Sequence, residues 1–384
     1  MDVAAQWAGG ILNIDLQAVA KNYRTLCQVI QRPDQTSGPH PICAAAVKAD
    51  AYGLDASLVA PVLEDAGCRH FFVAHLAEGV ALRPSVKNPQ SSILVLHGPP
   101  PGTARDLHEA GLVPVINSME QLAEWRALGR VLERRLPAVL QVDSGMARFG
   151  MNAGEVAKIA ADPALLDGIR TMLVMSHLAC ADTPEVSSNQ AQLEAFRHLS
   201  ASLPDAPRSL AASSGIFLGP DWHFDLVRPG AALYGVNPTP GKPSPVSPVI
   251  RLQARVIQTR AVPRGQAVGY GGGFVARRPS RIALLGIGYG DGFLRSISNQ
   301  GTAILPSQPD VPLPVIGRVS MDSLAVDITD LEDGRVRAGE LIDLIGPYNT
   351  LDAAATAAGT IGYEFLTDLG RRYHRTYTRN DPLV

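Results

Sequence analysis

What the sequence lacks narrows its function first. The 384 residues carry 34 lysines and arginines against 36 aspartates and glutamates, so the formal net charge is only −2. Such a balance provides no positive surface for nucleic acid or for an anionic membrane. We find no apolar run long enough to span a bilayer, and the N-terminus lacks a basic start followed by an apolar segment. We therefore expect a cytoplasmic protein that binds neither nucleic acid nor membrane.

Paired cysteines are also missing. The four cysteines, Cys27, Cys43, Cys68 and Cys180, lie far apart, without a CxxC pair or a histidine-rich neighbourhood. Neither a disulfide framework nor a zinc site is indicated, so we expect no metal. Reduced thiols agree with a cytoplasmic location.

The first part of the chain alternates between two kinds of segment. A strand at 11–14 and a helix at 16–30, capped by Asp15, come first. Eight apolar runs of strand character follow, and segments of helical composition lie between most of them, such as 56–66, 103–110, 119–128, 153–160 and 190–202. These runs are residues 41–48, 70–75, 92–97, 112–116, 138–142, 171–177, 209–213 and 224–228. Eight strands alternating with helices over about 230 residues predict an α/β fold, a (β/α)8 barrel of the TIM type.

The character of the chain changes at a proline-rich stretch over residues 238–245, which predicts a semi-rigid linker. Beyond it, alternating or short apolar runs at 250–262, 282–288, 315–328 and 340–345 indicate a mostly β domain. We predict a barrel over residues 1–240 and a β domain over residues 241–384.

A lysine stands at the end of the first barrel run. Lys48 closes the small apolar run Ala44–Val47 and is followed by Tyr52 and Gly53. One interpretation is a lysine that extends its amine into solvent. The other is an amine partly removed from water, with a lowered pKa, that forms a Schiff base with a carbonyl compound.

Other polar residues also follow barrel strands, where TIM-type enzymes build their active sites. They are the segment 143–150 after the fifth run, His177 after the sixth, Ser213 and Ser214 after the seventh, and Arg228 to Gly230 after the eighth. Alone, His177 is more often structural and Arg228 more often part of an ion pair. The last two turns lie where this fold commonly binds phosphate. A Schiff-base lysine facing a phosphate site is the layout that pyridoxal phosphate needs.

Several short motifs then carry a resemblance over essentially the whole chain. They are AVKADAYG (46–53), DSGMAR (143–148), SHLA (176–179), RPGAALYG (228–235), VGYG (268–271), GYGDG (288–292), GRVSMD (317–322) and GYE (362–364). In this order they resemble the alanine racemases, pyridoxal-phosphate enzymes of fold type III with an N-terminal barrel and a C-terminal β domain.

The resemblance implies a role for each matching residue. Lys48 would carry the cofactor and act as one base, and Tyr270 would be the second base, supplied across a homodimer to the partner's site. The groups implied to bind the cofactor are Lys48, Tyr52, His177, Ser214, Arg228, Gly230, Ala231 and Tyr363. Arg148 and the backbone of Met321 would hold the substrate carboxylate. The implied gate comprises Tyr289 and Asp322, with Asp182, Arg318 and Ile361 farther out.

The implied reaction interconverts L-alanine and D-alanine by two-base proton transfer on a cofactor aldimine, and supplies D-alanine for peptidoglycan. Two bases on opposite faces of the substrate carbon allow racemisation in both directions. Tyrosine has an ordinary pKa near 10, and a chain from Arg228 through His177 to Tyr270 would lower the cost of a tyrosinate by positive charge. Arg228 at the pyridine nitrogen would leave that nitrogen unprotonated.

Two positions depart from the family pattern. Gln141 stands where many members have a carbamylated lysine that orients Arg148, and Ser213 replaces a common asparagine. Two alternatives stay open: a racemase of broader specificity, and a non-catalytic pyridoxal-phosphate-binding protein, which would lack the second domain.

Overall fold

The structure is a computed structural model that describes residues 3–31 and 40–379. The chain folds into two compact units. The barrel unit comprises residues 20–233 and 237–246, and the β unit comprises residues up to 19, 234–236 and 247 onward. We expected the division at residue 240. The first residues lie instead with the β unit, because the N-terminal strand is hydrogen-bonded within its sheet.

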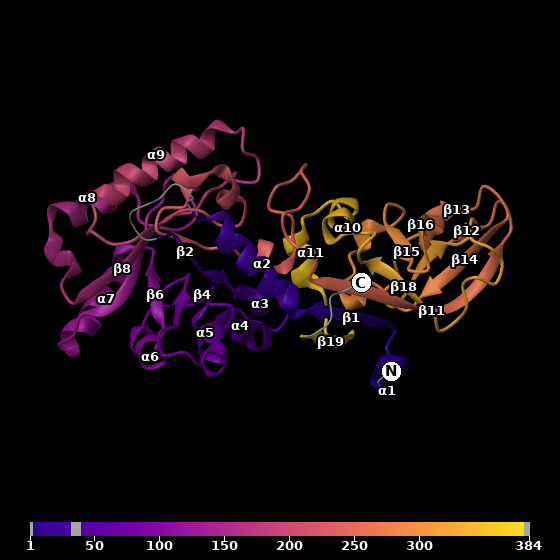
Figure 1. The fold of residues 1–384 in the computed structure, drawn as a ribbon, viewed down its shortest axis with the longest axis horizontal. Coiled ribbons are helices and arrows are strands. Elements are labelled where there is room, and N and C mark those ends of the chain that lie inside the picture. Colours follow the sequence, from indigo (N-terminus) through magenta and orange to yellow (C-terminus); the bar gives the residue numbers. More distant parts are fainter. Residues whose placement is uncertain (1–2, 32–39, 380–384) are drawn as a thin grey trace. The chain divides into compact units, whose positions relative to one another are not determined.

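The barrel unit is built on parallel strands in chain order (Figure 1). They are β2 (Ile42–Cys43), β3 (Ala45–Ala46), β4 (His70–Val73), β5 (Ser92–Val95), β6 (Val113–Ile116), β7 (Leu136–Gln141), β8 (Ile169–Met175), β9 (Arg208–Ser209) and β10 (Leu226–Val227). Strands β3 to β9 form one sheet. β10 pairs with β2, which precedes β3 by one residue, and a bridge joins Ala212 to Arg228. The predicted barrel is confirmed, with β2 and β3 as its interrupted first strand.

Helices cover the outside of these strands (Figure 1). They are α2 (Leu16–Val29), α3 (Lys48–Gly53), α4 (Ala56–Asp65), α5 (Leu76–Leu82), α6 (Ala104–Glu109), α7 (Met119–Val131), α8 (Ala153–Ala161) and α9 (Ser187–Ala201). Asp15 caps α2 as predicted, since its Oδ1 accepts the Ala18 N–H at 2.9 Å. Helix α5 was not predicted. Inside the barrel, buried side chains such as Phe72, Leu94 and Met175 fill the space between strands, so the interior is a core and not a pore.

The β unit contains a closed antiparallel ring in the order β11, β14, β17, β16, β15 and β18, with β18 returning to β11. Its strands are β11 (Ile250–Val262), β14 (Ser280–Leu285), β15 (Thr302–Leu305), β16 (Gln308–Ile316), β17 (Leu324–Asp327) and β18 (Leu341–Ile345). Strands β1 (Gly10–Asp15) and β19 (His374–Thr378) extend it beside β11. The small strands β12 (Ala267–Val268) and β13 (Phe274–Val275) and the helices α10 (Leu351–Ala357) and α11 (Gly362–Asp368) complete the unit.

One predicted segment of the β unit is interrupted in its middle. The predicted apolar segment 315–328 is not one strand, because residues 317–323 leave the sheet between β16 and β17. Gly317 has a φ of +71°, and its N–H donates to Asn299 Oδ1 at 2.7 Å. The Val319 N–H donates to Ser298 Oγ at 3.0 Å. Side chains thus replace the strand ladder and hold Arg318, Met321 and Asp322 in a loop.

No helix within residues 3–31 and 40–379 is long and apolar enough to cross a membrane.

Candidate active site

Lys48 begins a turn of unusual handedness at the carboxyl end of β3. The four residues after it, Ala49 to Tyr52, have φ angles between 50° and 57°, so α3 is largely a left-handed turn. None of them is glycine, and a left-handed helix costs about 1–2 kcal/mol per L-residue. Such a segment persists only where neighbouring groups hold it.

Glu78 supplies that support from the first turn of α5. Its carboxylate accepts the N–H groups of Ala49 at 2.8 Å, Ala74 at 2.6 Å and His75 at 3.1 Å. Three charge-assisted bonds join the turn after Lys48 to the end of the neighbouring strand β4. Glu78 was not among the residues predicted from the sequence. The sequence does contain a signal for Glu78: it is an acidic residue in the first turn of a helix that directly follows a barrel strand.

The amine of Lys48 is poorly solvated. Burial lowers its pKa most, the positive charge of Arg148 lowers it further, and Glu78 opposes both. A lysine in such a place is neutral more often than one in water, as nucleophilic and basic roles require. Of the two interpretations of Lys48, the structure favours the amine partly removed from water.

Arg228 is buried at the end of β10 and is fixed by several acceptors. Its guanidinium donates to Ser209 Oγ, to the Ser176 carbonyl at 2.5 Å and to the Leu210 carbonyl at 3.4 Å. One terminal nitrogen lies 3.4 Å from His177 Nδ1. Burial lowers the arginine pKa to about 9, which still leaves it charged at neutral pH.

His177 is neutral beside this arginine. Burial first, then the charges of Arg228, Arg148 and Lys48, lower its pKa to about 3. Three cations act on His177 and oppose its protonation, so within the predicted chain from Arg228 through His177 to Tyr270 the charge belongs to Arg228. An arginine can only donate, so Nδ1 accepts and Nε2 carries the hydrogen. His177 therefore offers an N–H donor, not a charge.

The turns after β9 and β10 meet through Ser213. Its Oγ accepts the N–H of Gly230 at 3.0 Å and of Ala232 at 3.2 Å. The Gly230 N–H, expected to face a phosphate, thus already has a partner. Among the described residues, the Ala231 N–H and the Ser214 hydroxyl, nearly buried, have no hydrogen-bond partner.

Gly230 also leaves space that any side chain would fill. A Cβ at this position would collide with the Tyr52 hydroxyl and lie 3.2 Å from the Ala46 Cβ. Tyr52 itself is buried. The phenol, the glycine and the two unpartnered donors therefore belong to one small polar region at the end of the barrel.

The loop after β7 presents Arg148 to solvent. Asp143 Oδ1 accepts the N–H groups of Gly145, Met146 and Ala147, which shapes the turn. The Arg148 guanidinium lies 5.7 Å from the centre of the Phe149 ring and has no hydrogen-bond partner in the described part of the chain.

Gln141 does not reach the guanidinium of Arg148. Its amide donates to the Phe149 carbonyl at 3.4 Å. Gln141 therefore fixes the backbone next to Arg148, and the guanidinium keeps its donors for a ligand.

The β unit carries its own group of candidate residues. Tyr270 opens the turn η6 (Tyr270–Gly272), and its side chain is 70% exposed. Gly269 and Gly271 flank it with positive φ. A Cβ on Gly271 would lie 2.9 Å from the Arg318 guanidinium, so Arg318 packs against the Tyr270 turn.

Tyr289 and Met321 stand on two segments joined by their backbones. The Tyr289 N–H donates to the Ser320 carbonyl at 3.0 Å, and the Gly290 N–H donates to the Met321 carbonyl at 2.8 Å. Arg372, which was not predicted to belong to the site, bonds the buried Asp291 at 2.7 Å and Asp322 at 2.7 Å. Three predicted residues, Tyr289, Met321 and Asp322, are thus brought together.

The remaining candidates are Asp182, Ile361 and Tyr363. Asp182 is exposed in the loop after β8 of the barrel unit. Ile361 is 60% exposed just before α11, and Tyr363 is partly buried in the first turn of that helix.

The lowered pKa of His177 makes a testable contribution to acid sensitivity. The unfolded chain binds a proton below about pH 6.5, but folded His177 does so only near pH 3, so stability falls as pH drops between these values. At pH 5 this costs on the order of 2 kcal/mol relative to neutral pH. Between pH 7 and pH 5, we expect the unfolding free energy of His177→Asn to fall by about 2 kcal/mol less than that of the wild type, as measured by chemical denaturation. His198→Gln, at an exposed site on α9, is the control, and equal pH dependence in all three proteins would contradict the assignment.

Comparison with known proteins matches this chain to one family over most of its length. Residues 14–238 match the family profile "Alanine racemase, N-terminal domain", and residues 249–377 match "Alanine racemase, C-terminal domain". A catabolic alanine racemase of Mesorhizobium japonicum is 51% identical over 96% of this chain and 93% of its own. An alanine racemase of Brucella canis is 47% identical over 96% of this chain and 94% of its own.

Solved structures agree as well. A crystal structure of alanine racemase from Bartonella henselae, with covalently bound pyridoxal phosphate, superposes with a TM-score of 0.90 at 41% identity, covering 97% of this chain and all of that chain. The biosynthetic alanine racemase of Pseudomonas aeruginosa reaches a TM-score of 0.87 at 32% identity, with the same coverage of both chains. This chain therefore belongs to the alanine racemase family.

Proposed function

We propose that this protein is an isomerase that interconverts L-alanine and D-alanine, with pyridoxal phosphate held by Lys48. The observation that carries the proposal is the desolvated amine of Lys48, fixed at a barrel strand end by the Glu78-braced turn. Membership of the alanine racemase family supplies the reaction.

The residues at the end of the barrel fit this cofactor. Ser214 and Ala231 offer donors without partners among the described residues, and Gly230 lets the Tyr52 hydroxyl come close to the backbone of the same turn. A phosphate needs several such donors and no side chain in its way. We infer that Tyr52, Ser214 and the Ala231 N–H hold it, together with Tyr363, the fourth donor that the resemblance assigns.

Arg228 and His177 suit the other end of the cofactor. When bound, pyridoxal phosphate supplies an electron sink for the carbon that loses its proton. Arg228 keeps its charge and can only donate, so a ring nitrogen next to it stays unprotonated. We propose that Arg228 binds that nitrogen and that His177 provides a neutral N–H donor beside it.

Two bases complete the proposed mechanism. The neutral amine of Lys48 takes or returns the proton on one face of the substrate carbon. Tyr270 serves the other face, and its exposure in the β unit is consistent with a role in the active site of a partner subunit in a homodimer. Arg148, whose guanidinium lacks a protein partner in the described part, and the Met321 N–H would hold the carboxylate.

There are two candidate roles for the D-alanine that the reaction produces or consumes. We propose that the enzyme supplies D-alanine for peptidoglycan, in the cytoplasm. The catabolic names of two relatives favour consumption of D-alanine as the second candidate. A deletion strain that requires D-alanine for growth supports the first use, and one that only fails to grow on alanine as carbon source supports the second.

Covalent attachment is tested first. We expect purified protein to absorb visible light, and borohydride reduction followed by peptide mapping to place the cofactor on Lys48. Lys48→Ala should lose both signals, whereas Lys158→Ala, at an exposed site on α8, should keep them. Labelling of any other lysine would refute the assignment.

The second base is tested by mixing variants. We expect Tyr270→Phe to slow racemisation in both directions, and to impair proton removal from one enantiomer more than from the other, because each base serves one face. Subunit exchange between Lys48→Ala and Tyr270→Phe should restore part of the activity if sites are shared. Tyr348→Phe, also exposed in the β unit, serves as the control. Exchange without recovery would exclude shared sites.

Substrate range separates alanine racemase from the broader alternative. Tyr289, Met321 and Asp322 stand on segments locked by Arg372, which favours a narrow entrance to the site. We expect alanine to be preferred, serine to be at most about 10²-fold slower, and lysine and arginine to be negligible, in kcat/KM. Arginine turned over as efficiently as alanine would favour the broad-specificity enzyme. Cofactor binding with no turnover of any amino acid would favour the non-catalytic alternative.

A further inference from the structure

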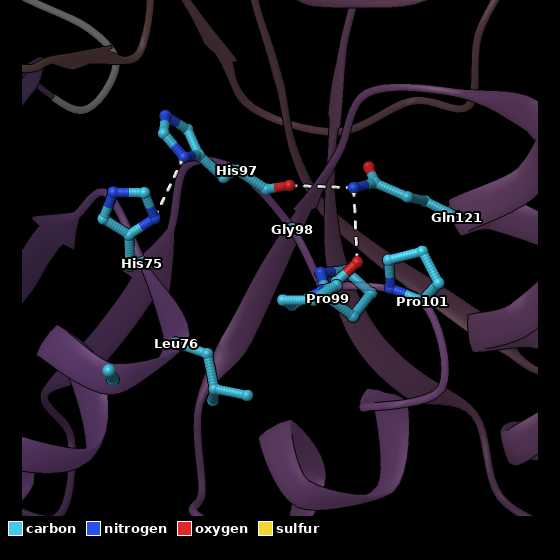
Figure 2. Close-up of a pocket in the computed structure, with 9 residues that line it drawn as sticks. His75, Leu76, His97, Gly98, Pro99, Pro101 and Gln121 are labelled. Carbon is cyan, nitrogen blue, oxygen red and sulfur yellow. Dashed lines mark hydrogen bonds between the residues drawn. The ribbon is translucent and has the colours of Figure 1, made fainter.

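Two histidines that the proposed mechanism does not use face each other at the carboxyl ends of β4 and β5 (Figure 2). His75 Nδ1 and His97 Nδ1 lie 3.2 Å apart, and their rings meet edge to face with centroids 4.5 Å apart. They line a pocket of about 690 Å³, together with Leu76 and the prolines 99–101.

Both imidazoles are mounted on fixed backbone. The His75 N–H donates to Glu78, and the His97 N–H donates to the Ala74 carbonyl at 3.0 Å. Gln121 donates to the His97 carbonyl at 2.8 Å, as the dashed line in Figure 2 shows. The His97 ring also packs 5.0 Å from the Phe149 ring. The backbone positions of both histidines are therefore fixed, and Phe149 restrains the His97 ring.

The contact between the two rings shows that one nitrogen is an acceptor. A hydrogen bond between the two Nδ1 atoms needs one donor and one acceptor, so one Nδ1 atom carries a lone pair. Burial first, and then His75, Lys48 and Arg148, lower the pKa of His97, and Glu78 opposes them. Neutral imidazoles with available lone pairs are ligands for transition metals.

The distance between the two Nδ1 atoms is close to that between two nitrogen ligands on one metal ion. Nitrogen ligands at the usual 2.0–2.1 Å from tetrahedral Zn²⁺ are about 3.3–3.4 Å apart, close to the observed separation. We infer that His75 and His97 form a two-histidine site for a divalent ion of the zinc class. On binding, the hydrogen between the two Nδ1 atoms moves to Nε2 of the ring that carried it, and the ion takes its other ligands from water or from an anion in the pocket.

The composition of the site limits which ions it accepts. No group of three or more histidine, cysteine or carboxylate ligands occurs in the described residues, so the bound ion stays open to solvent. The nearby carboxylate, Glu78, is already engaged by three N–H groups. Two nitrogens without a carboxylate suit Zn²⁺, Cu²⁺ or Ni²⁺ and do not suit Mg²⁺.

The test is calorimetric titration of tag-free, cofactor-loaded protein with Zn²⁺ near neutral pH, and with Mg²⁺ as the contrasting ion. We expect one Zn²⁺ per chain and no Mg²⁺. His97→Asn and His75→Gln should each weaken Zn²⁺ binding by roughly tenfold or more, because each removes one of two protein ligands. His198→Gln removes an exposed histidine on α9 and should bind like the wild type.

Thermal unfolding of each variant is measured alongside, so that loss of binding is compared among folded proteins. Absence of Zn²⁺ binding in the wild type, equal binding in the wild type and both pocket variants, or loss of binding in His198→Gln would overturn the inference. Because binding itself is measured, failure of this site leaves the proposed racemase activity unaffected.

Discussion

The carboxylate of Glu78 is the interaction on which the candidate active site depends. It accepts three backbone N–H groups and so holds the left-handed turn that directly follows Lys48. Its bond to the Ala49 N–H, together with the Ala51 N–H bond to Val47, offsets part of the cost of four non-glycine residues at positive φ. The same turn carries Tyr52, so one carboxylate positions both the amine and a phenol of the proposed cofactor site.

Positive charge is the second constraint on this region. Lys48, Arg148 and Arg228 lie within electrostatic reach of His177, and in the described part of the chain no carboxylate is hydrogen-bonded to any of the three. After burial, all three cations lower the pKa of His177 and keep it neutral, and Arg148 lowers the pKa of Lys48, which favours its neutral amine. An anionic cofactor and an anionic substrate would complete the charge balance. The cluster around His177 therefore suits a phosphate and a carboxylate.

Rigidity in the β unit comes from a different source. Segments around Tyr289 and Met321 exchange backbone hydrogen bonds, and Arg372 joins Asp291 to Asp322. Gly288 permits this close approach, because a Cβ there would collide with the Ser320 and Met321 carbonyls. Exposed side chains on such a braced platform keep a fixed spacing. That property suits residues proposed to limit the size of a substrate.

Sequence by itself determined the barrel, the β domain and most of the candidate residues, because strand ends and turns leave local signals such as Val47-Lys48 and Arg228-Pro229-Gly230. Only the tertiary structure decided what those residues contact. Arg372 was missed because its partners Asp291 and Asp322 lie on other segments, and the local capping position of Glu78 does not reveal its bond to the distant Ala49 N–H. The neutrality of His177 depends on cations that distant segments of the chain supply, and the pairing of His75 with His97 depends on two adjacent strands. Electrostatics and chelation act through space, so local sequence does not determine them.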